Sequence, residues 1–164
     1  MSNEVKVEIT LNGEARTVNV SPKALLVDTL RNSLDKKGTR IGCLTGDCGA
    51  CTVILNGQAT KSCLKLAGQA NHADVTTIEG LHDATLLQAA FVECKAFQCG
   101  YCTSGMVVVA WDFMRRNRHA TRDEIRRAIS GNLCRCTGYD KIVRAVQEAA
   151  QSLRSSNEGK AAAR

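Results

Sequence analysis

Alternation of apolar and polar residues at the start of the chain predicts a β-hairpin over residues 5–20. Val5, Val7 and Ile9 alternate with polar neighbours, and residues 15–20 alternate again. Asn12-Gly13, between the two runs, is a favoured two-residue turn. The chain therefore opens with two antiparallel strands.

The next residues predict one helix and further strands. Ser21-Pro22 is typical of a helix start, and apolar residues continue at helical spacing to residue 34. A glycine-rich loop follows over residues 38–51. Short apolar runs then predict strands, with Asn56-Gly57 as a second hairpin turn. These strands cover residues 51–55, 59–63 and 75–78. We expect a small mixed sheet crossed by one helix.

Beyond residue 79 the apolar spacing becomes helical. Apolar residues recur over residues 86–94, 105–116 and 139–153, and Thr121 with Glu124 forms a capping box before a fourth helix. The pattern predicts an α+β fold, with a sheet domain over residues 1–79 and a four-helix bundle over residues 80–154. Residues 155–164 are expected to be a disordered tail.

Composition favours an intracellular metal protein. The chain has 164 residues, of which 44% are hydrophobic, and neither a secretory signal nor a membrane span is expected. Halves of about 80 residues commonly need a metal to stabilise them. Nine cysteines, an odd number, in a chain expected to be cytoplasmic favour metal or redox chemistry over disulfides.

The net charge of +6 does not indicate a nucleic-acid partner. Residues 1–95 hold ten basic and ten acidic side chains, whereas residues 96–164 hold twelve and six. Aromatic residues make up only 4% of the chain, and no nucleic-acid recognition motif accompanies the charge. We expect a solvated or partner-facing basic surface.

Four cysteines in the first half have the spacing of a plant-type [2Fe–2S] site. Three of them follow the pattern C-x4-C-x2-C, and glycines between them allow the backbone to curl around one cluster. Zinc sites more often use two short cysteine pairs. The candidate ligands of this first set are Cys43, Cys48, Cys51 and Cys63.

Four cysteines in the second half form a second set whose metal the spacing leaves open. They make two short pairs, which either a [2Fe–2S] cluster or a structural zinc ion would fit. The candidate ligands are Cys99, Cys102, Cys134 and Cys136.

Cys94, the ninth cysteine, lies on the apolar side of an expected helix and is interpreted as core packing. No catalytic acid–base or nucleophile arrangement accompanies the cysteines, so the chain is not expected to be catalytic alone.

The motifs around both sets resemble one known family. The runs GCLTGDCGACTV, QCGYCTSGM and SGNLCRCTGY are similar to signatures of the iron–sulfur (small) subunit of the molybdenum hydroxylases, which include xanthine dehydrogenase and aerobic carbon monoxide dehydrogenase. The resemblance implies a plant-ferredoxin-like β-grasp domain and a helical domain, each with one [2Fe–2S] cluster. It further implies that Gln98 and Cys136 lie close to the molybdopterin of a partner subunit.

The same resemblance implies a role in electron transfer. Electrons would pass from molybdopterin, in its cytosine dinucleotide form, in a large subunit through both clusters to FAD in a medium subunit or to another acceptor. The complex would be a heterotrimer or a dimer of heterotrimers. Two alternatives are a free two-cluster ferredoxin and a zinc-binding interaction module. Asp47, inside the first motif, is expected to disfavour the more negative reduced state of a cluster there.

Overall fold

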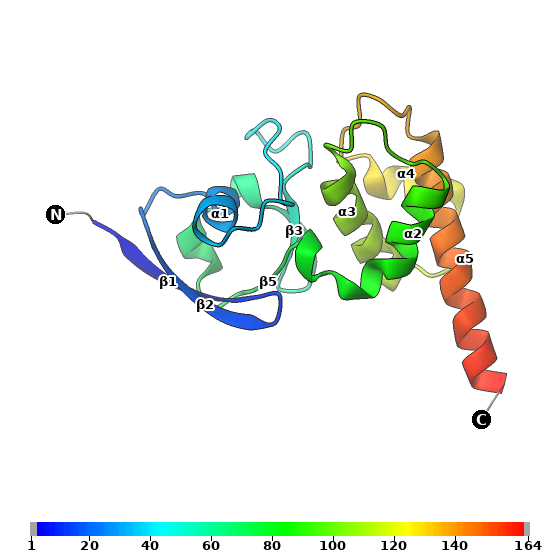
Figure 1. Ribbon diagram of the computed structural model, residues 1–164, viewed down its shortest axis with the longest axis horizontal. Helices are drawn as coiled ribbons and strands as arrows, with labels where there is room; N and C mark the ends of the chain where they lie inside the picture. The colour runs from blue at the N-terminus through cyan, green and yellow to red at the C-terminus, as the bar shows by residue number, and fades with distance from the viewer. Residues whose placement is uncertain (1–2, 163–164) are drawn as a thin grey trace.

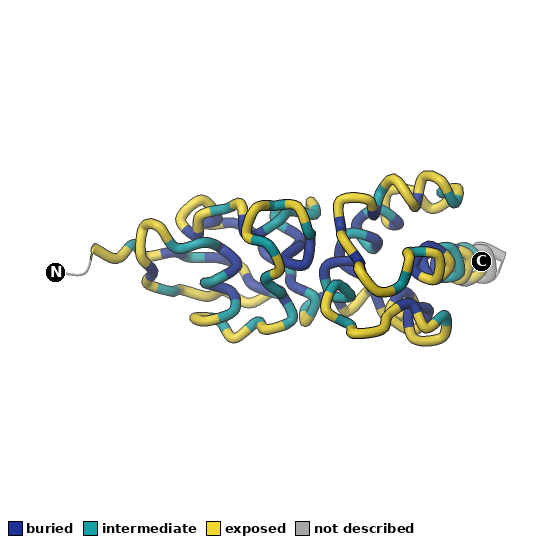
Figure 2. The backbone as a smooth tube through the Cα atoms, turned by 90° about the horizontal axis from the view of Figure 1, so that it is seen from above, coloured by how far each residue is buried: buried dark blue, intermediate teal, exposed yellow. Residues whose placement is uncertain are grey.

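A computed structural model describes the backbone of residues 3–162 and the side chains of residues 3–155. The molecule is elongated, with a sheet domain near the N-terminus and a helical domain near the C-terminus (Figure 1). Buried residues concentrate inside each of these two parts (Figure 2). The α+β fold class predicted from the sequence is confirmed.

The sheet domain is a five-stranded mixed sheet with the order β2-β1-β5-β3-β4. Its strands are β1 (Val5–Leu11), β2 (Glu14–Val20), β3 (Thr52–Leu55), β4 (Gln58–Lys61) and β5 (Asp74–Thr76). β1 pairs with β5 in parallel, and the other neighbours are antiparallel. The predicted hairpin is confirmed, because Asn12 and Gly13 both take positive φ angles at its turn. The alternating residues Val7, Ile9 and Leu11 point into the core of this domain.

The helix expected over residues 22–34 is shorter than predicted. It starts at α1 (Leu26–Asp28) and continues as a π-helical turn, Thr29–Ser33. Two backbone bonds hold the preceding segment extended, since Leu26 N donates to Lys65 O and Ala67 N donates to Ala24 O, both at 2.8 Å. Pairing with a distant segment thus overrides the local helix signal at Pro22.

The helical domain contains the four helices that the sequence predicts. They are α2 (Thr85–Glu93), α3 (Thr103–Arg116), α4 (Arg122–Ile129) and α5 (Asp140–Ala162). The capping box is present at the start of α4, where the Thr121 side chain and Glu124 bond each other's backbone N–H groups. α5 runs past residue 153, so residues 155–162 of the expected tail are helical, and residues 163–164 lie outside the described residues.

The two domains share one packed boundary. The core of the helical domain includes Ile54 of β3, and Ala59 and Ile78 pack against it. Asn12 ties the segment between the domains to the first hairpin, because its side chain accepts from Thr77 N at 2.8 Å and donates to Thr77 Oγ1 at 3.1 Å. The domain division at residue 79 stays a prediction, but the fold fixes where the cysteine loops can meet.

Candidate metal centres

The first cysteine set lies where the loop over residues 42–51 meets the short helix after β4. Cys63 belongs to a 3-10 turn, Ser62–Leu64, and not to the strand that the sequence predicted for it. Ser62 is fully buried, and its hydroxyl donates to the carbonyl oxygen of Cys51 at 2.7 Å. This bond brings the buried thiols of Cys51 and Cys63 together.

Within this set the thiols form an outer and an inner pair. Cys43 and Cys48 are partly exposed and interact through their side chains, whereas Cys51 and Cys63 are buried and interact with each other. Burial, followed by the Cys51 thiol, raises the pKa of Cys63 to about 11. Cys43 also acts electrostatically on Cys63, so the two pairs lie near each other.

Donors around Cys43 favour its thiolate. The Thr45 hydroxyl and then the backbone N–H groups of Cys48 and Thr45 lower the pKa of Cys43 to about 6. Both N–H groups donate to Cys43 Sγ at 3.4 Å. The single hydroxyl proton of Thr45 is directed to Asp47 Oδ2 at 2.6 Å, so the two N–H groups are the donors that geometry supports. They are placed as donors to a cluster thiolate should be.

The second set has the same division into pairs. Cys99 and Cys136 are exposed, and their sulfur atoms lie 3.6 Å apart. Two thiolates bound to one tetrahedral metal at about 2.3 Å would lie about 3.8 Å apart, so this pair is close to the spacing for one metal ion. Cys102 and Cys134 form the inner pair, and burial followed by the Cys134 thiol raises the pKa of Cys102 to about 12.

This arrangement of pairs suits two metal ions in each set. Each set offers two thiol pairs, one nearer the surface and one further inside, and a two-iron cluster needs one pair for each iron. The residues therefore fit a [2Fe–2S] group at both sites.

The loops of the two sets touch each other directly. Leu133 N donates to the carbonyl oxygen of Cys48 at 2.9 Å, and Leu133 immediately precedes Cys134. The buried Asn132 side chain donates to Gly49 O at 3.1 Å. One ligand loop of the helical domain thus lies on the ligand loop of the sheet domain.

A second contact joins residues 40–41 to the residues that follow Cys99. Arg40 donates to Gly100 O at 2.7 Å, and its guanidinium stacks over the ring of Tyr101 at 5.3 Å. The Tyr101 hydroxyl donates to Ile41 O at 2.6 Å. Sequence reasoning missed Arg40, Tyr101 and Asn132, and only their position within a few residues of candidate ligands could have drawn attention to them.

The remaining candidate residues have the following surroundings. Gln98 and Cys136 are brought together, since Gln98 Nε2 donates to Cys136 O at 2.9 Å. Cys94 packs against the helical core, and its thiol donates to Glu148 Oε2 at 3.0 Å. Burial, followed by Glu148, raises the pKa of Cys94 to about 11. The three histidines, His72, His82 and His119, are exposed.

Comparison with known proteins decides the chemistry that the spacing of the second set left open. A family described as "2Fe-2S iron-sulfur cluster binding domain" matches residues 9–74, and one described as "[2Fe-2S] binding domain" matches residues 77–147. The nicotinate dehydrogenase small FeS subunit of Eubacterium barkeri is 45% identical over 91% of this chain and 97% of its own length. The chain belongs to the small iron–sulfur subunits of the molybdenum hydroxylases.

Other relatives agree with this assignment. The nicotine 6-hydroxylase small subunit of Paenarthrobacter nicotinovorans is 42% identical over 95% of this chain and 96% of its own. The crystal structure of quinoline 2-oxidoreductase from Pseudomonas putida 86 matches with a TM-score of 0.89 and 40% identity, over 94% of this chain and 98% of that chain. Aldehyde oxidoreductase from Desulfovibrio desulfuricans matches with a TM-score of 0.87 and 40% identity, over 92% of this chain but only 17% of its own.

These findings make the small iron–sulfur subunit an oxidoreductase component with a 2Fe-2S binding domain in each half. Its curated relatives are small subunits of multi-subunit enzymes. No helix among its described residues is long and apolar enough to cross a membrane.

Proposed function

We propose that this subunit carries electrons between the molybdenum cofactor of a large partner subunit and an acceptor, FAD in a medium subunit. A [2Fe–2S] cluster, when bound, takes up and releases one electron at a time. Cys43, Cys48, Cys51 and Cys63 would hold one cluster. Cys99, Cys102, Cys134 and Cys136 would hold the other.

The observation that carries this proposal is the contact between the two ligand loops. The bond from Leu133 N to Cys48 O joins residues that belong to, or adjoin, different sets. Each set also has a thiol pair that reaches the surface: Cys43 and Cys48 are partly exposed, and Cys99 and Cys136 are exposed. A thiol pair at the surface of each site and a direct contact between the sites form the arrangement that a relay between two partners requires.

The family resemblance supports a direction for the electrons. It implies that Gln98 and Cys136 lie close to the molybdopterin, and the bond from Gln98 to Cys136 O holds these two residues together beside Cys99. The pair of Cys43 and Cys48 would then face the flavin subunit. In this scheme the eight thiolates would hold the clusters. Backbone N–H groups donate to Cys43, and three of the inner ligands, Cys51, Cys63 and Cys134, are buried away from water.

Purification of the native complex tests the proposal. We expect the subunit to co-elute with a large chain that contains molybdenum in a molybdopterin cytosine dinucleotide and with a medium chain that contains FAD. We also expect about four irons per copy of this subunit. A red-brown protein that elutes alone would instead be a free two-cluster ferredoxin, and the proposal would be wrong.

A further inference from the structure

Asn132 is a polar side chain buried at the contact between the two ligand loops. Only 3% of the residue is exposed, and its Nδ2 atom donates to Gly49 O at 3.1 Å. Its backbone N–H donates to Ile129 O at 2.9 Å, which fixes the residue to the end of α4. A buried amide N–H group without an acceptor is costly, so this bond is strongly favoured.

The packing around this bond requires glycine on both of the facing segments. A Cβ atom on Gly49, which has a φ of +71°, would lie 2.3 Å from Asn132 Oδ1. A Cβ atom on Gly105, at the start of α3, would lie 2.2 Å from Gly49 O. The carbonyl of Gly49 is thus enclosed by α3 and by Asn132, and neither side leaves room for it to shift.

This enclosure also determines the neighbouring backbone contact. Gly49 follows Cys48, and Asn132 precedes Leu133, so the Asn132 bond and the bond from Leu133 N to Cys48 O lie side by side. The bond from Leu133 N to Cys48 O completes a path from Cys48 to Cys134. This path consists of covalent backbone bonds and one hydrogen bond. Electronic coupling along such a path falls steeply when the hydrogen bond opens to a gap.

We propose that Asn132 is a positioning residue that sets the electronic coupling between the two cluster sites. It does so by holding the Cys48 carbonyl on the Leu133 N–H group. This inference rests on the proposed function, because it assigns Cys48 and Cys134 to two different clusters.

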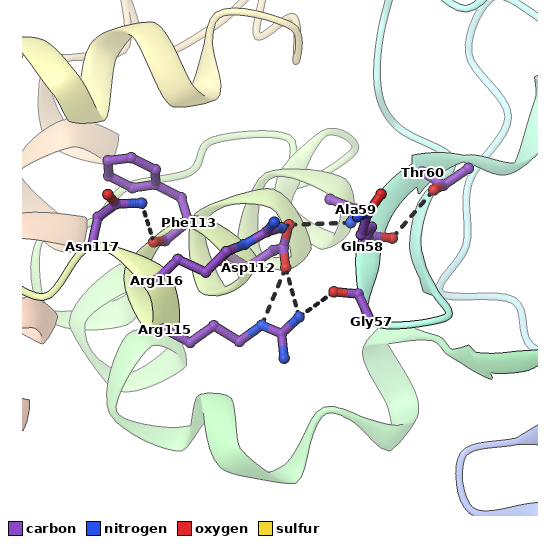
Figure 3. Close-up of polar contacts among 9 residues, drawn as sticks. All are labelled: Gly57, Gln58, Ala59, Thr60, Asp112, Phe113, Arg115, Arg116 and Asn117. Carbon is purple, nitrogen blue, oxygen red and sulfur yellow. Dashed lines mark hydrogen bonds and ion pairs between the residues drawn. The ribbon is translucent and has the colours of Figure 1, made fainter.

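A purely structural role would make Asn132 equivalent to other ties between the domains. Asp112 of α3 provides such a tie, because its Oδ2 atom accepts from Ala59 N at 3.1 Å (Figure 3). Arg115 and Arg116 pair with the same carboxylate, and Arg115 also donates to Gly57 O. This cluster joins α3 to the β3–β4 turn and contains none of the candidate ligands, so Asp112→Ala is a matched control.

The experiment compares Asn132→Ala with Asp112→Ala in the purified complex. Iron content is measured first. The magnetic interaction between the two reduced clusters is then measured by electron paramagnetic resonance, and the rate of electron passage between them by rapid reduction. Asn132→Ala is expected to keep its iron, weaken the magnetic interaction and slow the electron passage several-fold. Asp112→Ala is expected to leave both readouts as in wild type, although it breaks two ion pairs.

The remaining outcomes would contradict either this inference or the proposed function. An unchanged interaction in Asn132→Ala, or equal losses in both variants, would overturn the inference. If Asn132→Ala loses iron, Asn132→Asp, which has the same size but no N–H donor, is measured in its place. Loss of iron in that variant as well would make Asn132 a folding residue and overturn the inference. A wild-type protein without two clusters would instead contradict the proposed function itself.

Discussion

Gln98 Nε2 donates a hydrogen bond to the carbonyl oxygen of Cys136 at 2.9 Å, and this bond connects the two ends of the second ligand set. Gln98 precedes Cys99, whose sulfur lies 3.6 Å from that of Cys136. This bond from a side-chain amide to a backbone carbonyl restrains the exposed pair, Cys99 and Cys136, whereas burial restrains Cys134 of the inner pair.

Gln98→Ala is therefore expected to loosen the exposed thiol pair of the second set. A neutral hydrogen bond contributes about 0.5–1.5 kcal/mol, which should raise the rate of iron loss to a chelator about 2- to 12-fold. Iron release is measured by the absorbance of the chelate. Gln58→Ala, at an exposed position of β4, is the control and should release iron at the wild-type rate. Equal rates in all three proteins would contradict the expectation.

Substitution of one candidate ligand in each set should remove one cluster and leave the other. Cys43→Ala and Cys102→Ala are each expected to lower the iron content from about four to about two per chain, because the sets lie in different domains. Cys94→Ala should keep about four irons, since Cys94 bonds Glu148 and belongs to neither set. Iron analysis with spectra of the reduced proteins checks this. A Cys94→Ala protein that lost iron would contradict the ligand sets.

Cys94 should make the free energy of unfolding fall at alkaline pH. Its pKa is about 11 in the folded protein against an ordinary value of 9.0, because of burial, Glu148 and Glu93, with Arg144 acting in the opposite direction. Below about pH 9 the thiol is protonated in both states and its contribution is complete. As the pH rises from about 9 to about 11, the unfolded chain loses this proton first, so stability falls.

Urea unfolding under reducing conditions measures this fall in wild type and in Cys94→Ala. The variant lacks the thiol, so its stability should decline less over the same pH range. Other groups titrate in both proteins, and the difference between the two curves isolates Cys94. Parallel curves would show that the Cys94 pKa is not raised.

Asp47→Asn should raise the reduction potential of the first cluster. Asp47 is exposed and accepts from the Thr45 hydroxyl, and Thr45 N donates to Cys43 Sγ. Removing one negative charge near the cluster in a largely aqueous setting is worth on the order of 0.5 kcal/mol, or about 20 mV for one electron. A redox titration followed by electron paramagnetic resonance measures the shift. Asp83→Asn in the helical domain is the control, and a potential for Asp47→Asn no higher than wild type would contradict the expectation.

Local sequence signals predicted much of the fold because they depend on interactions between residues that are close together in the chain. The turn at Asn12-Gly13 and the capping box of Thr121 and Glu124 both involve residues within three positions of each other. The start of α1 could not be predicted in this way. Leu25 forms an isolated β-bridge with Leu66. The residues around Pro22 carry no local signal for pairing with so distant a segment.

Cysteine spacing alone indicates the chemistry of the first set. The C-x4-C-x2-C spacing with its glycines indicates a [2Fe–2S] site, because the ligands of one curled loop lie within nine residues of each other. How the two sets meet depends on the packing of the two domains. The bonds from Asn132 to Gly49 and from Leu133 to Cys48 join residues more than eighty positions apart, and their partners become defined only when α3 and the loop after α4 pack against the first ligand loop.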